Sequence, residues 1–322
     1  MVVNRSFAKP LPEAFLVLAL ILFLFGGCST GKGFKLAIET GGGDQKNMDK
    51  AAEQPTFFVS DDTKALPEIS GDEYEQLGDA LLNKGNLYLA YVQYEKSLKL
   101  KPDNIRVEYK KGLTLLLGEK NDDAIRQFEM VLKKEPKLDL ANEGLGRAYF
   151  QKKDFLIAER HFKKAIDQNH KLWMSYNFLG NICDNKQDYE KAILEYTSAI
   201  SIKPDQGFLY NNLGVSCLLA GHHQAAVDAF GKAVEKNYRE SRVFNNMALA
   251  YANLSRYDDA TEAFRKAGGE PHAYNNMGCI YLEKGNYSEA VRCFEKAIAL
   301  EPSFYAKAND NLKKAKTLAA KQ

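Results

Sequence analysis

The stretch PHAYNNMGCIYLEKGNYSEAVRCFEKAIALEPSF, residues 271–304, decides the fold of this chain. When it is numbered from 1, its small and apolar residues fall at positions 4, 7, 8 and 11, and again at 20, 24 and 27. Steps of three and four residues place each group on one face of a helix. Gly285 lies between the groups and predicts a turn, and Pro302 ends the second helix. The stretch therefore predicts two antiparallel helices.

The same pattern occurs seven times, and position 20 is alanine and position 24 is Tyr or Phe in every copy. Position 8 is glycine except for Ala248 in the sixth copy, which has 30 residues and closes with Gly268-Gly269-Glu270. That short turn predicts a shortened second helix or a changed stacking angle. A hairpin of this kind cannot bury its apolar face alone, so neighbours must stack. The seven repeats are 71–104, 105–138, 139–172, 173–206, 207–240, 241–270 and 271–304.

The C-terminal residues 305–322 carry an apolar stripe opposite a lysine-rich side, which predicts a solvated capping helix. The sequence thus predicts an all-α fold, an α-solenoid of seven helical hairpins with a C-terminal capping helix. The positions of glycine, alanine, the aromatic residue and proline resemble the tetratricopeptide repeat over 71–304. The resemblance implies a right-handed superhelix whose concave groove binds protein or peptide segments.

Residues 1–27 resemble a bacterial lipoprotein signal peptide. Arg5 and Lys9 precede a short apolar run, which ends in small residues before Cys28. The resemblance implies cleavage and lipidation at Cys28, with ordinary cleavage or an uncleaved anchor as the alternatives. Ser29 is not the Asp that usually retains lipoproteins at the inner membrane, so we expect a lipid anchor on the periplasmic side of the outer membrane. Residues 28–70 are rich in glycine and charge and predict a flexible tether.

In the resembled family the first helix of each pair lines the groove through positions 2, 5, 6, 9 and 12. Asparagines gather at these positions in the last four repeats. An amide offers both a donor and an acceptor, so a ladder of amides predicts hydrogen bonds to the backbone of a partner segment. The alternative is that the asparagines only solvate the helices. The predicted groove residues are Asn177, Asn211, Asn245 and Asn275 at position 5, Asn212, Asn246 and Asn276 at position 6, and Asn181 at position 9.

Arg242 at position 2 of the sixth repeat is the one basic residue that matches the carboxylate clamp of chaperone-binding repeats. We therefore include it as a candidate for binding a C-terminal carboxylate. At the other end of the array, Asp72, Glu75 and Asp79 share one face of the first helix. Their mutual repulsion predicts either a basic partner segment or a solvated end face.

The cysteines and histidines do not form a recognisable catalytic or metal-binding pattern. No two of the five cysteines have CxxC spacing, so zinc and thioredoxin-like chemistry have no support. Cys183 and Cys217 occupy a core position and predict buried free thiols, whereas Cys279 at position 9 is expected to face the groove. We expect no enzyme, no cofactor and no metal. The net charge of +2 gives no field that favours nucleic acid.

Lipid signal, tether and repeat array together resemble the lipoproteins that assist tight-adherence and type IV pilus assembly, including pilotins. This resemblance implies a membrane-anchored interaction scaffold that helps to assemble an envelope machine such as a pilus or secretin. Its partners are expected to be protein or peptide segments that bind in the groove. A peptidoglycan-linked or hydrolase-regulating adaptor is the alternative.

Overall fold

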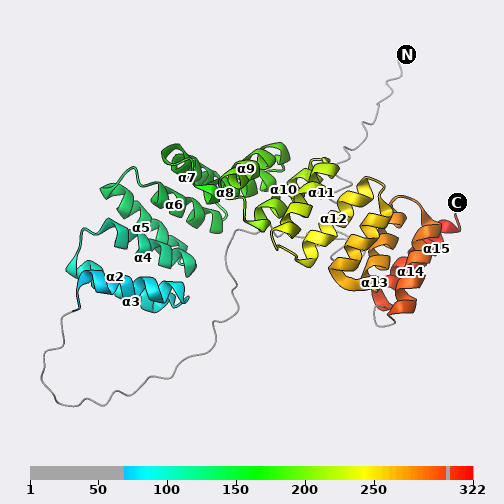
Figure 1. Ribbon diagram of the computed structural model, residues 1–322, viewed down its shortest axis with the longest axis horizontal. Coiled ribbons are helices and arrows are strands. Elements are labelled where there is room, and N and C mark those ends of the chain that lie inside the picture. The colour runs from blue at the N-terminus through cyan, green and yellow to red at the C-terminus, as the bar shows by residue number, and fades with distance from the viewer. Residues whose placement is uncertain (1–68, 302–304, 322) are drawn as a thin grey trace, which may run out of the picture. The chain divides into compact units, whose positions relative to one another are not determined.

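The computed structural model describes residues 69–301 and 305–321. Over these ranges the chain forms fourteen α-helices and no strand (Figure 1), which confirms the all-α prediction. The expected signal peptide, the lipidated Cys28 and the tether lie outside the described residues. Among the helices that are described, none is both long and apolar enough to cross a membrane.

The described residues divide into two compact units, which we call the N-terminal unit (residues 69–182) and the C-terminal unit (residues 183–321). The boundary falls within α8 (Trp173–Asn185). The N-terminal unit contains α2 (Gly71–Asn83), α3 (Leu87–Leu100), α4 (Ile105–Leu117), α5 (Asn121–Lys134), α6 (Asp139–Gln151) and α7 (Phe155–Gln168). The C-terminal unit contains α9 (Tyr189–Ile202), α10 (Gly207–Leu219), α11 (His223–Glu235), α12 (Ser241–Asn253), α13 (Tyr257–Glu283), α14 (Tyr287–Leu300) and α15 (Tyr305–Ala319).

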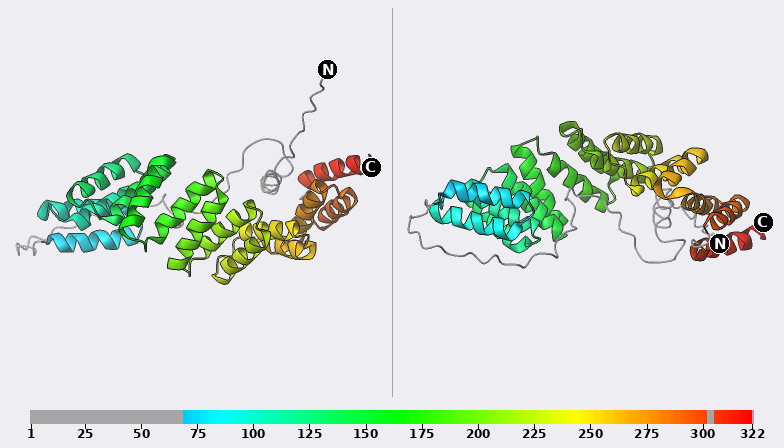
Figure 2. Two further views of the ribbon diagram at one scale, coloured as in Figure 1. Left: turned by 90° about the horizontal axis from the view of Figure 1, so that it is seen from above. Right: turned by 60° about the horizontal axis from the view of Figure 1, so that its bottom comes forward.

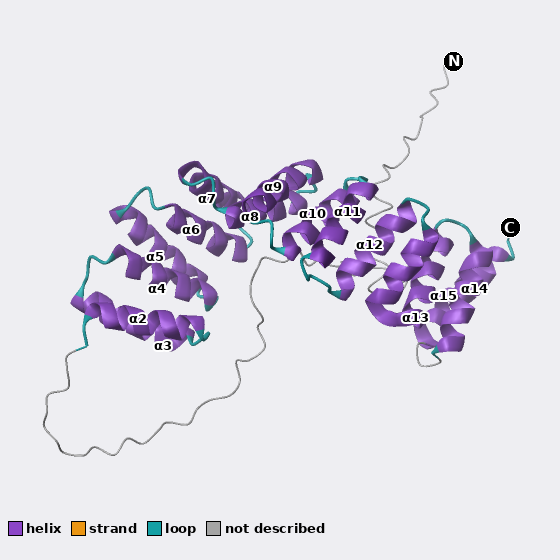
Figure 3. Ribbon diagram, viewed as in Figure 1, coloured by secondary structure: helices purple, strands orange, loops and turns teal. Residues whose placement is uncertain are grey.

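Within each unit consecutive helices pack as hairpins joined by short loops (Figures 2 and 3). Glycine at position 8 is what lets the two helices of a hairpin approach. A Cβ atom on Gly78 would lie 2.5 Å from Cε1 of Tyr94, and one on Gly278 would lie 2.6 Å from Cε1 of Phe294. The aromatic ring at position 24 therefore occupies the space that a side chain at position 8 would need. These rings are fully buried and form the centre of each hairpin.

Two repeats carry tyrosine instead of phenylalanine at position 24, and each tyrosine has a carboxylate partner. The hydroxyl of Tyr94 donates to Asp79 Oδ1 at 2.8 Å, and that of Tyr196 donates to Asp184 Oδ2 at 2.8 Å. A buried hydroxyl without a partner is costly, so the tyrosine and the aspartate depend on each other.

The short sixth repeat ends at a sharp break inside α13. Gly268 (φ −158°, ψ 15°) and Gly269 (φ +85°, ψ −178°) leave the helical conformation, and the chain re-enters a helix at once. The positive φ of Gly269 is one that L side chains rarely adopt. The second helix of repeat six therefore ends before Gly268 and is shorter than the second helices of the other repeats, as one of the two predicted outcomes has it, and it joins the first helix of repeat seven without a loop.

The C-terminal end of the array is covered by α15, which packs against α14. Ala308 and Ala315 are fully buried on its inner face, whereas Lys313, Lys314 and Lys316 are exposed. The helix therefore gives the last hairpin an apolar neighbour on one side and a solvated surface on the other.

Candidate functional site

The predicted groove asparagines are buried rather than solvated, with Asn246 as the half-buried exception. A purely solvating role is therefore wrong for the seven buried ones. Asn177 and Asn181 lie on α8 in the N-terminal unit, so the predicted ladder is divided. The C-terminal unit keeps three consecutive repeats of it, on α10, α12 and the second half of α13. The candidate site is confined to these three repeats, and its members are Asn211, Asn212, Asn245, Asn246, Asn275 and Asn276.

Neighbouring asparagines at positions 5 and 6 interact in a fixed direction. Asn211 Nδ2 donates to Asn212 Oδ1 at 3.4 Å, and Asn275 Nδ2 donates to Asn276 Oδ1 at 3.3 Å. Asn211 and Asn275 thereby use their side-chain nitrogens within the helix and leave their oxygens for another group. The side chains of Asn211, Asn245 and Asn275 are 2 %, 5 % and 8 % exposed.

Within the described part of the chain, the Oδ1 atoms of Asn211, Asn245 and Asn275 are buried and have no hydrogen-bond donor. We call these three oxygens the acceptor row. A buried polar atom that lacks a partner costs about 1–3 kcal/mol, and native structures contain few of them. Three such atoms at the same position of three consecutive repeats form a periodic set of hydrogen-bond acceptors.

Arg242, the carboxylate-clamp candidate, is engaged within the C-terminal unit. Its guanidinium contacts Glu240 at 2.7 Å and lies 5.8 Å from the ring centre of Tyr238. The ion pair already supplies this arginine with a carboxylate. Its predicted role in binding a partner's carboxylate stays a prediction.

The acidic cluster at the start of the array is neutralised within the N-terminal unit. Glu75 is 4 % exposed and contacts Arg106 and Lys110, each at 2.7 Å, and Lys110 also contacts Asp79 at 2.6 Å. Burial raises the pKa of Glu75, but the hydrogen bonds from Arg106 and Lys110 outweigh burial and hold that pKa below its ordinary value. Asp72 pairs with Lys101 at 2.6 Å. The predicted solvated face is therefore wrong for Glu75, whereas the side chains of Asp72 and Asp79 are 59 % and 40 % exposed, and the basic partner segment stays a prediction.

Cys279 does not face a groove, because α15 covers it. The thiol is 2 % exposed, and Asn311 Nδ2 lies 3.6 Å from its Sγ. Among the described residues, Cys183, Cys217, Cys279 and Cys293 form no disulfide bond. Burial raises the pKa of both Cys217 and Cys293 to about 11, which disfavours the reactive thiolate. Among the described residues no group of His, Cys, Asp and Glu side chains could hold a metal ion.

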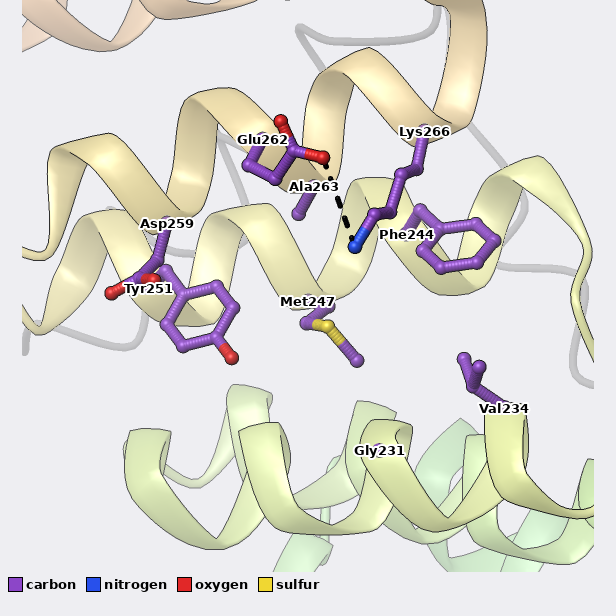
Figure 4. A pocket seen from close by; sticks show the side chains of 9 residues that line it. All are labelled: Gly231, Val234, Phe244, Met247, Tyr251, Asp259, Glu262, Ala263 and Lys266. Carbon is purple, nitrogen blue, oxygen red and sulfur yellow. Dashed lines mark ion pairs between the residues drawn. The ribbon is translucent and has the colours of Figure 1, made fainter.

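A cavity of about 210 Å³ between α11, α12 and α13 of the C-terminal unit was not predicted (Figure 4). Phe244, Met247 and Tyr251 of α12 line it, together with residues of α11 and α13, and Lys266 Nζ lies 3.8 Å from Glu262 Oε1 beside it. A Cβ atom on Gly231 would meet no atom within 4 Å. The sequence signal was this glycine at position 25, where the other six repeats carry Glu, Lys, Thr or Arg.

The fold and the periodic first-helix site define a class of protein, the α-solenoid scaffold built from helical hairpins. Models described as "Tetratricopeptide repeat" match residues 74–104, 109–170, 175–206, 213–273 and 271–304, about two thirds of the chain. The chain therefore belongs to the tetratricopeptide-repeat family. Its fold is that of a protein–protein interaction scaffold, and proteins of this family are generally not enzymes.

Solved structures show the same fold. The C-terminal part of a TPR repeat-containing protein from Cytophaga hutchinsonii is similar with a TM-score of 0.58 and 20 % identity, over 74 % of this chain and 98 % of that one. Cut9 in the APC/C hetero-tetramer Cut9–Hcn1 is similar with a TM-score of 0.51 and 20 % identity, over 76 % of this chain and 49 % of that one. This chain thus spans about half of that second structure. MamA is 29 % identical over 53 % of this chain and 94 % of its own, with a TM-score of 0.44. No curated protein sequence matches the chain.

Proposed function

We propose that the C-terminal unit binds an extended segment of a protein partner, and that backbone N–H groups of this segment donate to the acceptor row. The observation that carries the proposal is the set of three buried amide oxygens without donors at position 5 of three consecutive repeats. These oxygens have almost no accessible surface in the free chain, so each side chain must turn toward the groove before a partner N–H can reach it; a backbone donor then removes the cost of the stranded oxygen. Because every non-proline residue has an N–H group, this mode of recognition has little dependence on the partner's side chains.

The spacing of the repeats favours one conformation of the partner. Packed helices lie about 8–10 Å apart. A polyproline II segment rises about 3.1 Å per residue with three residues per turn, so equivalent N–H groups recur about every 9.3 Å. A β-strand directs equivalent N–H groups to one side about every 6.6 Å, which does not match. We therefore expect every third N–H group of a polyproline II-like segment to reach one oxygen of the acceptor row.

Peptide binding tests this proposal directly. Binders selected from a random peptide library against the full chain are resynthesised with one backbone N-methyl group at each position in turn. We expect methylation at three positions, each three residues from the next, to weaken binding at least tenfold, because it removes the donor. A binder that tolerates N-methylation throughout would overturn the proposal.

The protein side of the test uses the combined variant Asn211→Ala, Asn245→Ala and Asn275→Ala. It should lose the affinity for the same peptides and also their sensitivity to N-methylation. The matched control changes Gln224 and Asp228 on α11, which bond to each other at 2.9 Å on an exposed second-helix face. This control should bind like the unaltered chain. Equal binding by the asparagine variant would contradict the role of the acceptor row.

We further propose that the partner belongs to an envelope machine such as a pilus or secretin, and that a lipid on Cys28 anchors the scaffold to the outer membrane. The support is the sequence of residues 1–30 and the tether that follows. Affinity purification of the full chain from solubilised envelope discriminates this proposal from its rival. Secretin or pilus subunits would support the first, and peptidoglycan hydrolases would favour a hydrolase-regulating adaptor instead.

A further inference from the structure

The first hairpin of the array has no preceding hairpin among the described residues, so one of its faces lacks the neighbour that the other hairpins have (Figure 1). Position 7 of a first helix faces the second helix of the preceding repeat. In the second repeat Lys111 contacts Glu95 of α3, and in the third repeat Leu145 packs with Phe128 of α5. Leu145 is 1 % exposed, whereas its equivalent in the first repeat, Leu77, is 46 % exposed.

Apolar side chains make up most of this face on α2. Tyr74, Leu77 and Leu81 follow one another in steps of four and three residues, so they share one side of the helix. Tyr74 and Leu81 are half-buried. Lys96 of α3 lies beside them, with its Nζ atom 5.4 Å from the ring centre of Tyr74. The face thus combines an apolar surface with one cation.

Leu100 extends the face along α3. It stands at position 30 and is 56 % exposed. Lys134, its equivalent in the second repeat, bonds to the Pro102 carbonyl oxygen of the preceding repeat at 3.4 Å, so position 30 also faces the preceding repeat. The end repeats of an array need a polar outer surface or a cover, because no further repeat buries them. We call the following residues the N-terminal end face: Tyr74, Leu77, Leu81, Lys96 and Leu100.

The start of α2 directs the incoming chain toward this face. Ser70 is the N-cap of α2, and its side chain takes part in a capping box. Ile69 before it and Tyr74 after it therefore have the N′ and N4 spacing of a hydrophobic staple, which fixes the angle at which the chain enters the helix. Because Tyr74 belongs to the N-terminal end face, a staple brings the preceding chain to that side of α2.

The sequence that leads into α2 has a composition that suits the N-terminal end face. Residues 1–68 lie outside the described part of the chain, and the last fourteen of them read PTFFVSDDTKALPE, residues 55–68. Phe57-Phe58-Val59 is an apolar cluster, and the acidic pair Asp61-Asp62 follows it closely. The apolar cluster matches the leucines and the tyrosine of the face, and the acidic pair matches Lys96.

The apolar cluster is also close enough in the sequence to reach the whole face. Residues 59–68 span up to about 33 Å when extended. Leu77 lies only roughly 12 Å along α2 from Ile69, at about 1.5 Å per residue. Because the cluster belongs to the same chain, its effective concentration at the face is about millimolar, which favours it over a second copy of the protein at lower concentration.

We propose that Phe57, Phe58 and Val59 pack on the N-terminal end face of the same molecule, with Asp61 and Asp62 next to Lys96. For the first repeat this segment takes the place that the second helix of the preceding repeat takes for the others. It covers the open end of the array against association with a second copy, and it leaves the acceptor row free. The predicted tether can then extend from Cys28 only as far as the residues before Phe57.

Photo-cross-linking of the full chain tests this proposal. The photoreactive residue p-benzoylphenylalanine replaces Leu77, and the cross-linked peptides are identified by mass spectrometry. We expect cross-links to residues 55–62 of the same molecule, in a yield that does not change with protein concentration. The matched control places the probe at Leu156 of α7, which is 64 % exposed in the same unit but lies at position 18, away from the face; it should not reach residues 55–62. Cross-links between two molecules, or none to residues 55–62, would overturn the proposal.

The combined variant Phe57→Ser and Phe58→Ser separates specific packing from mere proximity in the sequence. It should lower the yield of cross-links from position 77 about tenfold and speed the hydrogen exchange of α2 amides at least about fivefold, because the cover is lost. Phe34→Ser changes an aromatic residue of the same predicted tether farther from α2, and it should alter neither quantity. An unchanged yield in the combined variant would contradict the packing of the two rings. These measurements need no partner, so their failure would leave the proposed peptide binding intact.

Discussion

Replacing Asn245 by alanine should stabilise the C-terminal unit, although a buried residue in a packed helix is truncated. The Oδ1 atom of Asn245 is buried without a donor, so its removal relieves about 1–3 kcal/mol of desolvation cost. Alanine also has the higher helix propensity, by up to about 0.7 kcal/mol. Against this stands the space left behind, roughly 25 Å³, which costs about 0.6 kcal/mol at 24 cal/mol per Å³. The net expectation is a gain of about 1–2 kcal/mol.

Asn142 provides the matched control, because it is equally buried but fully paired. It is 3 % exposed, its Nδ2 donates to Gln168 Oε1 at 3.2 Å, and its Oδ1 lies 3.2 Å from His161 Nδ1. Asn142→Ala removes both bonds, and because Gln168 is exposed and can bond to water, we expect a loss of about 1 kcal/mol. The same substitution should thus have opposite signs at the two positions.

Native-state hydrogen exchange is the suitable assay, because it reports the free energy of opening separately for each helix. Asn245→Ala should slow the exchange of α12 amides and Asn142→Ala should speed that of α6 amides. Destabilisation of α12 by more than about 1 kcal/mol would refute the reasoning, since it would mean that the Asn245 oxygen is stabilising in the free protein. Although Asn245→Ala should be more stable, it should bind the selected peptides more weakly, because it lacks one oxygen of the acceptor row.

Three further perturbations test other parts of the chain. Burial raises the pKa of Asp184 to about 6, so between about pH 4 and 6 this carboxyl binds a proton in the folded state but not in the unfolded state. The free energy of unfolding should therefore fall by about 3 kcal/mol as the pH rises through that window. Urea unfolding at several pH values should show this fall, and Asp184→Asn should abolish it. Lys110→Met removes one of the charged donors of Glu75 and should lower the free energy of unfolding, measured in urea, by about 1–3 kcal/mol. This loss should be equally large in 1 M salt. An unchanged unfolding midpoint would contradict the assigned pairing. Cys28→Ala should release the protein from sedimented membranes in fractionation, and retention in the membrane pellet would contradict the lipid anchor.

The fold could be predicted because the same residue types recur at the same packing positions in each repeat. Glycine, or alanine in the sixth repeat, at position 8, alanine at position 20 and an aromatic residue at position 24 recur where the two helices of a hairpin meet, and sequence spacing alone places them on facing sides. The break in α13 was harder to predict. The glycines at 268 and 269 showed that a turn was cut, but only the backbone shows that two helices join there without a loop.

The candidate site could be predicted only in part. The spacing of residues shows which helix face a side chain lies on, but it does not show whether neighbouring repeats bury that side chain. The asparagines of positions 5 and 6 were found by their periodicity, whereas their burial depends on the neighbouring repeats. Cys279 was misplaced because position 9 of the last repeat meets α15 instead of open groove.

The pairing of Glu75 with basic residues of the next repeat could have been predicted from the repeat positions. Arg106 and Lys110 stand at positions 2 and 6 of the second repeat, and Glu75 stands at position 5 of the first. Because stacked repeats place equivalent faces side by side, charges at these positions meet across one repeat. A comparison of each groove position with the next repeat, rather than with its own helix, would have paired them.

Two buried carboxylates on the first helices are compensated one repeat further on. Ser175 Oγ donates to Glu143 Oε2 at 2.7 Å, and Ser216 Oγ donates to Asp184 Oδ1 at 2.7 Å, each across 32 residues. These pairs show that the array has a regular way to satisfy a buried acceptor, namely a hydroxyl or a cation at the equivalent place in the next repeat. The acceptor row lacks this compensation in three successive repeats, although a single serine would supply it. The recurrence of this cost at one position of three successive repeats is the reason to look for its donor on a binding partner.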